Sequence, residues 1–110
     1  MTKTAPGKLI GKDGAIFSEF TSDHGLIEAQ FTLNVPVEYF LQGVGATLEY
    51  DNFDDLKGDF KITTDSVIGP DELHLLLVKD SGVKAKVTAK LESKLPSALK
   101  EGGTATFITF

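Results

Sequence analysis

The sequence contains no cysteine, no tryptophan and no arginine, and each absence excludes a class of function. Without cysteine there are no disulfides, no thiol nucleophile and no thiolate metal site. All eleven basic residues are lysines, so the planar fork with which arginine reads guanine edges and grips phosphate is missing. We therefore expect a protein that does not bind nucleic acid.

Long apolar runs are also absent, since none approaches the ~20 residues that a membrane-spanning helix needs. We therefore expect no membrane span. Residues 1–7 carry no apolar segment of the kind found in a secretory signal, so the simplest compartment is the cytoplasm. With 110 residues and 25% charged residues, the chain has the size and composition of one globular domain. We expect residues 1–7 to form a flexible N-terminal arm and residues 8–110 to form that domain.

The clearest pattern is an unbroken alternation of apolar and polar residues from 82 to 92. Successive side chains of a strand point to opposite faces, so this stretch predicts one strand with a buried face and a wet face. A helix would scatter its lysines around the circumference. Similar alternation occurs at 27–35 and 44–50, and Asp13-Gly14 between apolar runs predicts a hairpin.

Short strands separated by turns every 8 to 12 residues are typical of an antiparallel sandwich or a small barrel. We predict an all-β fold, an antiparallel β-sandwich of about 7–9 short strands, with a small β-barrel as the alternative. One or two short helical turns are expected at 36–42 and 93–101, because a proline lies near the start of each segment and a glycine follows it. If the fold is a barrel, a further alternative is an interior that holds an apolar ligand.

Three lysines lie on the wet face of the strand at 82–92, and a fourth precedes it. Lysine on an edge strand discourages pairing with other chains, which is the simplest interpretation of this pattern. The functional interpretation is a basic face that meets an acidic partner. The candidate partner-binding residues are Lys79, Lys84, Lys86 and Lys90.

An acidic loop at 49–59 offers the oxygen ligands that calcium prefers. The loop departs from the EF-hand pattern, because Phe53 occupies the third position counted from Asp51. The simpler interpretation is a solvated loop whose side chains satisfy turn amides. The candidate metal ligands are Asp51, Asn52, Asp54, Asp55 and Asp59.

Catalytic machinery is hard to find in this sequence. No serine lies in a nucleophile elbow, and nothing marks one carboxylate as desolvated beside another. The two histidines, His24 and His74, would need to meet in space to form a zinc site, and each is more simply a turn or core residue. We therefore expect a protein that is not an enzyme and needs no cofactor.

The sequence thus favours a non-enzymatic binding or assembly module that acts through protein–protein contacts. Its partner would be another protein or a second copy of itself, joined through the acidic region at 49–59 and the basic strand face. The alternative is a calcium-dependent module, binding carbohydrate through the acidic loop. The lack of tryptophan counts against an aromatic sugar platform.

Overall fold

The computed structural model describes residues 3–12, 15–33, 41–69, 71–91, 99–100 and 102–109. These residues form ten β-strands and one 3-10 turn, so the all-β prediction is confirmed. All pairings described are antiparallel. In chain order the elements are β1 (Lys3–Lys12), β2 (Ala15–Ser22), β3 (Gly25–Leu33), β4 (Leu41–Tyr50), η1 (Phe53–Asp55), β5 (Gly58–Ile62), β6 (Val67–Ile68), β7 (Glu72–Val78), β8 (Lys84–Leu91), β9 (Leu99–Lys100) and β10 (Gly103–Thr109).

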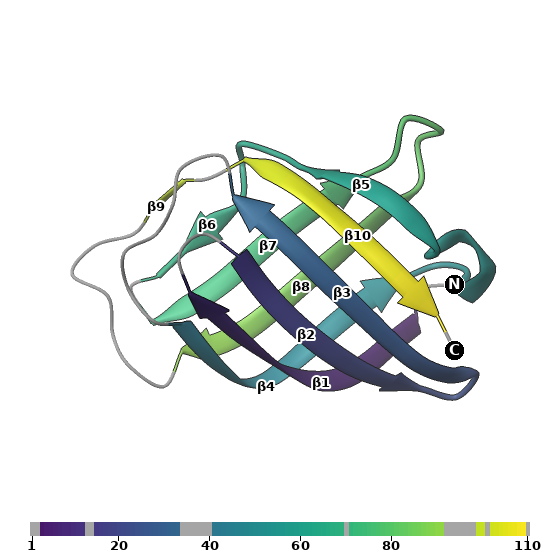
Figure 1. Ribbon diagram of the computed structural model, residues 1–110, viewed down its shortest axis with the longest axis horizontal. Coiled ribbons are helices and arrows are strands. Elements are labelled where there is room, and N and C mark those ends of the chain that lie inside the picture. Colours follow the sequence, from purple (N-terminus) through teal and green to yellow (C-terminus); the bar gives the residue numbers. More distant parts are fainter. Residues whose placement is uncertain are drawn as a thin grey trace.

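Eight of these strands close into a barrel, whose front wall crosses its back wall in Figure 1. The neighbours follow the order β5-β10-β3-β2-β1-β4-β8-β7, and β7 returns to pair with β5. The predicted sandwich is therefore wrong, and the small barrel is the correct alternative. Alternation reports only which face of each strand is buried, and a sandwich and a barrel require the same alternation.

The closing contact is short. β5 pairs along its whole length with β10, but it meets β7 in register at Lys61 opposite Val78 and Ile62 opposite Leu77. Beyond these pairs, Lys61 Nζ lies 3.9 Å from Asp80 Oδ1. We call this contact the seam of the barrel.

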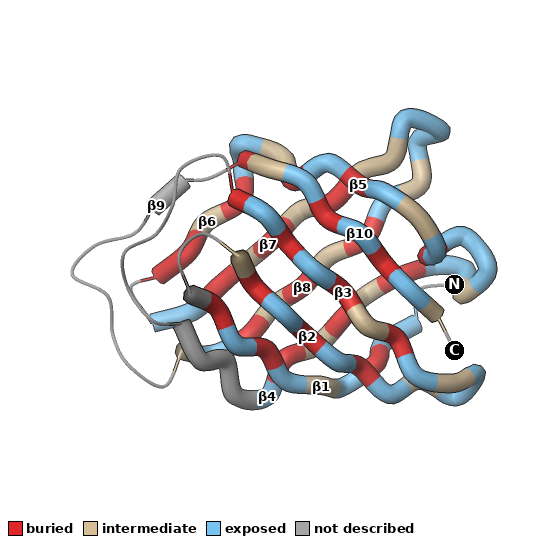
Figure 2. Tube along the Cα trace, viewed as in Figure 1, coloured by how far each residue is buried: buried red, intermediate tan, exposed pale blue. Residues whose placement is uncertain are grey.

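The buried hydrophobic residues form one core cluster. Figure 2 shows buried positions alternating with more exposed ones along the strands of the barrel. Phe107 packs edge-to-face on Phe31 at 5.9 Å and tilted on Phe60 at 5.0 Å between ring centroids. An eight-stranded barrel has an interior about as wide as its own side chains fill. A barrel of this size can also hold one small ligand, so the apolar-ligand alternative stays a hypothesis. The buried residues also include six alanines: Ala5, Ala29, Ala46, Ala85, Ala89 and Ala105.

β5 and β6 run along β7 as one strand interrupted by a bulge. The β5–β6 segment advances five residues from Ile62 to Val67, while β7 advances only three, from Leu77 to His74. The buried Ser66 Oγ accepts the Leu76 N–H at 2.9 Å, which replaces the missing ladder bond. Past the bulge, the two residues of β6 pair with β7 on one side and with β9 on the other.

Two local expectations differ from the structure. Residues 3–7, expected to be a flexible arm, belong to β1 and pair with β4 from Lys3 to Gly7. Of the two expected helical turns, residues 36–40, 93–98 and 101 lie outside the described residues, while 41–42 begin β4 and 99–100 form β9. The described turn of helix is η1, in the acidic loop. No helix among the described residues is long and apolar enough to cross a membrane.

Candidate functional site

The strand that carries the candidate lysines is not an edge. β8 pairs with β4 on one side and with β7 on the other. The interpretation of Lys84, Lys86 and Lys90 as guards of an exposed edge is therefore wrong, because all the backbone groups of a central strand can bond to its neighbours. The alternation itself is confirmed, since Ala85, Val87 and Ala89 are buried.

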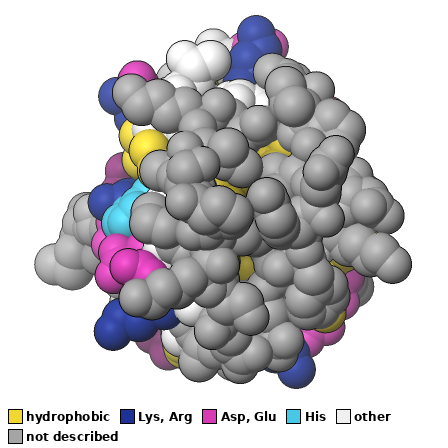
Figure 3. Space-filling model, turned by 90° about the vertical axis from the view of Figure 1, so that its left-hand side faces the viewer, with side chains coloured by type: hydrophobic (Ala, Val, Ile, Leu, Met, Phe, Trp, Pro, Cys, Tyr) yellow, Lys and Arg dark blue, Asp and Glu magenta, His cyan; other side chains and the backbone are white. Residues whose placement is uncertain are grey.

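Acidic side chains lie directly beside these lysines on the outer wall. Glu49 of β4 is opposite Lys86, and Glu72 of β7 is opposite Lys90. We call the surface formed by these strands the lysine face: Glu49, Glu72, Lys84, Lys86 and Lys90. Figure 3, which views the barrel from one end, shows described lysine, acidic and histidine side chains side by side along one margin.

Lys79, the fourth candidate, does not belong to the lysine face, because its contacts are with Lys57 and Phe60. Its Nζ donates to the Lys57 carbonyl at 2.7 Å and lies 5.0 Å from the centre of the Phe60 ring. This lysine links the end of β7 to the entry of β5, so its contacts are those of a structural residue at the seam.

A shallow groove of about 390 Å³ lies on the outer wall beside the lysine face. Half-buried Leu76 and Val78 contribute apolar surface, and Lys84 and Lys86 lie among charged residues of both signs. Thr63 also lines the groove, and its buried hydroxyl has no hydrogen-bond partner among the described residues. This groove offers no patch of a single charge.

Two candidate metal ligands of the acidic loop accept hydrogen bonds from neighbouring residues. Asn52 Oδ1 accepts the Asp54 N–H at 3.0 Å and caps η1, and Asp59 Oδ1 accepts the Thr106 hydroxyl at 2.9 Å. Asp51, Asp54 and Asp55 are exposed. Among the described residues, no group of three or more His, Asp or Glu side chains has an arrangement that could hold a metal ion.

The histidines make separate contacts. His74 Nε2 lies 3.2 Å from Glu72 Oε2 on the outer wall. The His24 ring lies 5.4 Å from the Phe53 ring at a tilt of 43°, and its Nε2 lies 3.5 Å from Lys3 Nζ. No contact among the described residues joins the two histidines, as a shared zinc site would require.

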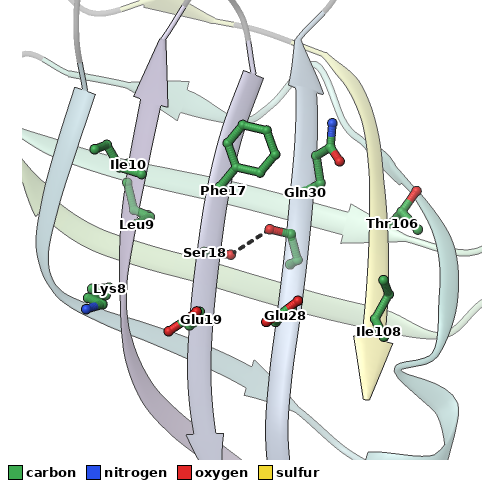
Figure 4. Close-up of a pocket in the computed structure, with 11 residues that line it drawn as sticks. Lys8, Leu9, Ile10, Phe17, Ser18, Glu19, Glu28, Gln30, Thr106 and Ile108 are labelled. Atoms are coloured by element: carbon green, nitrogen blue, oxygen red, sulfur yellow. Dashed lines mark hydrogen bonds between the residues drawn. The ribbon is translucent and has the colours of Figure 1, made fainter. Parts of the chain in front are cut away.

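The sequence reasoning missed an apolar surface on the opposite part of the wall. Ile10, Phe17 and Ile108 remain 47%, 54% and 50% exposed, although most large hydrophobic residues of the described chain are buried. They line an outer groove of about 620 Å³ that crosses β1, β2, β3 and β10. Figure 4 shows Phe17 between Ile10 and Gln30 in this groove.

Strand register arranges the side chains of this groove in two rows. Phe17 is opposite Ile10 on one side and Gln30 on the other, and Gln30 is opposite Thr106. The neighbouring row runs Lys8, Glu19, Glu28 and Ile108 across the same four strands. We call this surface the Phe17 face: Lys8, Ile10, Phe17, Glu19, Glu28, Gln30, Thr106 and Ile108.

Three charged side chains of the Phe17 face have no partner within the part of the chain that the structure describes. The side chains of Lys8, Glu19 and Glu28 make no hydrogen bond or ion pair among the described residues. Glu19 and Glu28 are directly opposite each other. Like charges facing each other across a strand pair are destabilising. At the floor of the groove the buried polar group does have a partner, since the Ser18 hydroxyl donates to the Ala29 carbonyl at 3.2 Å.

The sequence does contain a signal for this surface. Leu9-Ile10, Ile16-Phe17 and Phe107-Ile108 each place two large apolar residues in succession within a strand. Because successive strand residues face opposite ways, one member of each pair must point outward. What the sequence lacks is the register that brings the three outward members together.

Comparison with known proteins supports the fold and adds no activity. No protein family model matches the chain, and no curated protein matches it. Among solved structures, it is similar to the virulence-associated protein VapB from the intracellular pathogen Rhodococcus equi. The match has a TM-score of 0.53 and 13% sequence identity, and it covers 100% of both chains. At this identity the similarity extends to the fold alone.

Proposed function

We propose that this barrel is a non-enzymatic binding or assembly module that acts through protein–protein contacts, and that the Phe17 face is its docking surface. The observation that carries the proposal is the gathering of Ile10, Phe17 and Ile108 in one groove, each about half exposed. Ile10 and Phe17 are directly opposite each other, and Ile108 lies two strands from Phe17, beyond β3. Exposed apolar residues that share a groove with polar residues mark an interaction surface more often than scattered single ones do.

The composition of the face fits a protein partner. Aromatic anchors near the centre of an interface contribute most of its binding energy, while a polar rim supplies orientation. Phe17 has the central position, and Lys8, Glu19 and Glu28 lie beside it in the next row. Truncating such an anchor costs about 2 kcal/mol or more of binding free energy.

The lysine face is a weaker candidate for docking. Lys86 and Lys90 each lie opposite a glutamate of the same chain, as Lys8 does on the Phe17 face, so charge alone does not favour the lysine face. Exposed ion pairs contribute only about 0–1 kcal/mol each, and they steer association more than they hold it. The proposal therefore moves the contact from the lysines to the apolar groove.

Site-specific photo-cross-linking in cells that express the protein tests the proposed function. A photoreactive residue replaces Gln30 on the Phe17 face, and a second variant carries it at Thr88 on the other side of the barrel. We expect a discrete cross-linked protein product, either with itself or with another protein, from position 30 and not from position 88. Phe17→Ser should remove the product, and Lys86→Gln should preserve it.

Two results would contradict the proposal. One is a product that forms equally from both positions. The other is a product at position 30 that survives Phe17→Ser in a variant whose unfolding is unchanged.

A further inference from the structure

Four side chains on the β1–β2 side of the Phe17 face form a self-complementary patch. In the β1–β2 register, Lys8 is opposite Glu19 and Ile10 is opposite Phe17. Each pair joins groups of the kind that attract one another, a cation with an anion and an apolar side chain with an aromatic ring. The two pairs alternate along the strands with buried residues between them, so all four point outward.

Two copies can face each other across a two-fold axis that is parallel to the strands and lies midway between β1 and β2. This axis would exchange the positions of the two strands. It would therefore place β1 of one copy over β2 of the other. Lys8 would then meet Glu19 of the second copy, Ile10 would meet Phe17, and the same two contacts would recur on the other side of the axis. A dimer with this symmetry needs a patch that complements itself, and this patch does.

The neighbouring charges make this axis more favourable than one along β2. Rotation about β2 would place Glu19 on Glu19 of the second copy, a like-charge contact. Rotation between β1 and β2 avoids that contact, and a curved barrel wall touches a second wall over few strands. The β1–β2 pair, at one side of the Phe17 face, then decides the fit.

We propose that the partner of the Phe17 face is a second copy of this chain, bound about the axis between β1 and β2. This inference rests on the proposed function, since it names the occupant of the same surface. In the dimer each unpaired Lys8 gains a carboxylate from the second copy, and each exposed Phe17 is covered by Ile10. The affinity of the dimer depends on the buried area as well as on complementarity. For a patch of this kind we expect a dissociation constant in the micromolar to millimolar range.

Charge exchange between the two copies provides the experiment. Sedimentation equilibrium of the full chain, at up to about 1 mM protein, reports association across that affinity range. We expect the wild-type chain to dimerise, and Lys8→Glu and Glu19→Lys each to weaken dimerisation by about tenfold or more. Mixing the two single variants in equal amounts should restore association, because one protomer then presents two carboxylates and the other two ammonium groups.

Matched variants keep the test independent of folding and of net charge. Lys57→Glu and Asp65→Lys make the same charge changes at other exposed positions and should leave dimerisation within about twofold of wild type. The double variant Lys8→Glu with Glu19→Lys keeps the cross-strand pair within each copy and should dimerise with itself.

Three outcomes overturn this inference. The wild-type chain remains monomeric at the highest concentration, the single variants dimerise like wild type, or their mixture fails to associate. A monomer that still cross-links to another protein from position 30 would refute self-docking and leave the proposed function standing. Loss of both results would refute both.

Discussion

Two outer surfaces of the same barrel differ in how much apolar side chain they expose to water. On the lysine face, Lys86 and Lys90 lie opposite glutamates, and the apolar residues between them, Leu76 and Val78, are half-buried. On the Phe17 face, Lys8 likewise lies opposite Glu19, but the large apolar side chains are about half exposed and Glu19 also faces Glu28. The two surfaces therefore differ mainly in how much apolar side chain they expose to water, and we propose the more apolar one as the docking surface.

The strongest test of this contrast lies within one strand. Phe17 and Phe20 project from opposite sides of β2, one half exposed and one fully buried. Phe20→Ala should lower the free energy of unfolding by about 3–5 kcal/mol because it leaves a cavity in the core. Phe17→Ala should change it by no more than about 0.5 kcal/mol. Urea denaturation measures both, and a large loss from Phe17→Ala would make the Phe17 face a structural surface rather than a docking surface.

A second test addresses the support beneath the lysine face. Ser66→Ala removes the acceptor of the Leu76 N–H in the bulge between β5 and β6. A buried donor left without a partner costs about 1–3 kcal/mol, so we expect a loss of that size in chemical denaturation. Ser81→Ala, at an exposed turn position, is the control and should be neutral. Unchanged stability in the Ser66 variant would show that the bulge does not depend on this side chain.

The groove beside the lysine face contains a polar atom that lacks a described partner, and this permits a stabilising substitution. Thr63→Val keeps the shape of the side chain and removes the buried hydroxyl. We expect a gain of about 1 kcal/mol in unfolding free energy, because the cost of burying that group disappears. The exposed neighbour Thr64→Val should bring no such gain. A destabilised Thr63→Val variant would reveal a hydrogen bond at this hydroxyl.

Reversal of one charge should have a small effect on the lysine face. Lys86→Glu places a like charge directly opposite Glu49 and should cost about 0.5 kcal/mol of stability, while Lys86→Gln should cost less. High salt should reduce the difference between the two variants. A difference that persists in high salt would argue against the cross-strand charge balance described above.

The smallest effect is expected from calcium. Asn52 and Asp59 are engaged in local hydrogen bonds, so thermal unfolding in chelator and in millimolar calcium should have the same midpoint. A site occupied at about 100 times its dissociation constant would instead add about 2.7 kcal/mol and raise the midpoint by several degrees. Such a rise, absent from the double variant Asp54→Ala with Asp55→Ala, would establish the calcium-binding alternative.

Local alternation predicted the strands well because it is a property of each segment alone. The pattern at 82–92 predicted which side chains of β8 are buried. Asp13 and Gly14 lie outside the described residues, but β1 and β2 on either side of them pair as a hairpin requires, up to Lys12 opposite Ala15. Alternation could not predict closure, because the pairing of Ile62 with Leu77 depends on contacts between distant strands.

The candidate site was harder to predict for the same reason. Lys84, Lys86 and Lys90 stand out in the sequence because they are close together in one strand. Ile10, Phe17 and Ile108 are scattered along the chain, and only the registers of β1 with β2, β2 with β3, and β3 with β10 bring them together. A surface made from one strand is visible in the sequence, and a surface made across strands is not.

The short seam between β5 and β7 is the place where a strand edge would open if the barrel came apart. Each of the eight strands of the barrel has a neighbour on both sides, and an unpaired strand edge is a template for pairing with another chain. Two lysines lie at this seam, Lys61 beside Asp80 and Lys79 over the Phe60 ring. The sequence suggested lysines at an edge of β8, whereas the structure places other lysines at the one junction that closes the barrel.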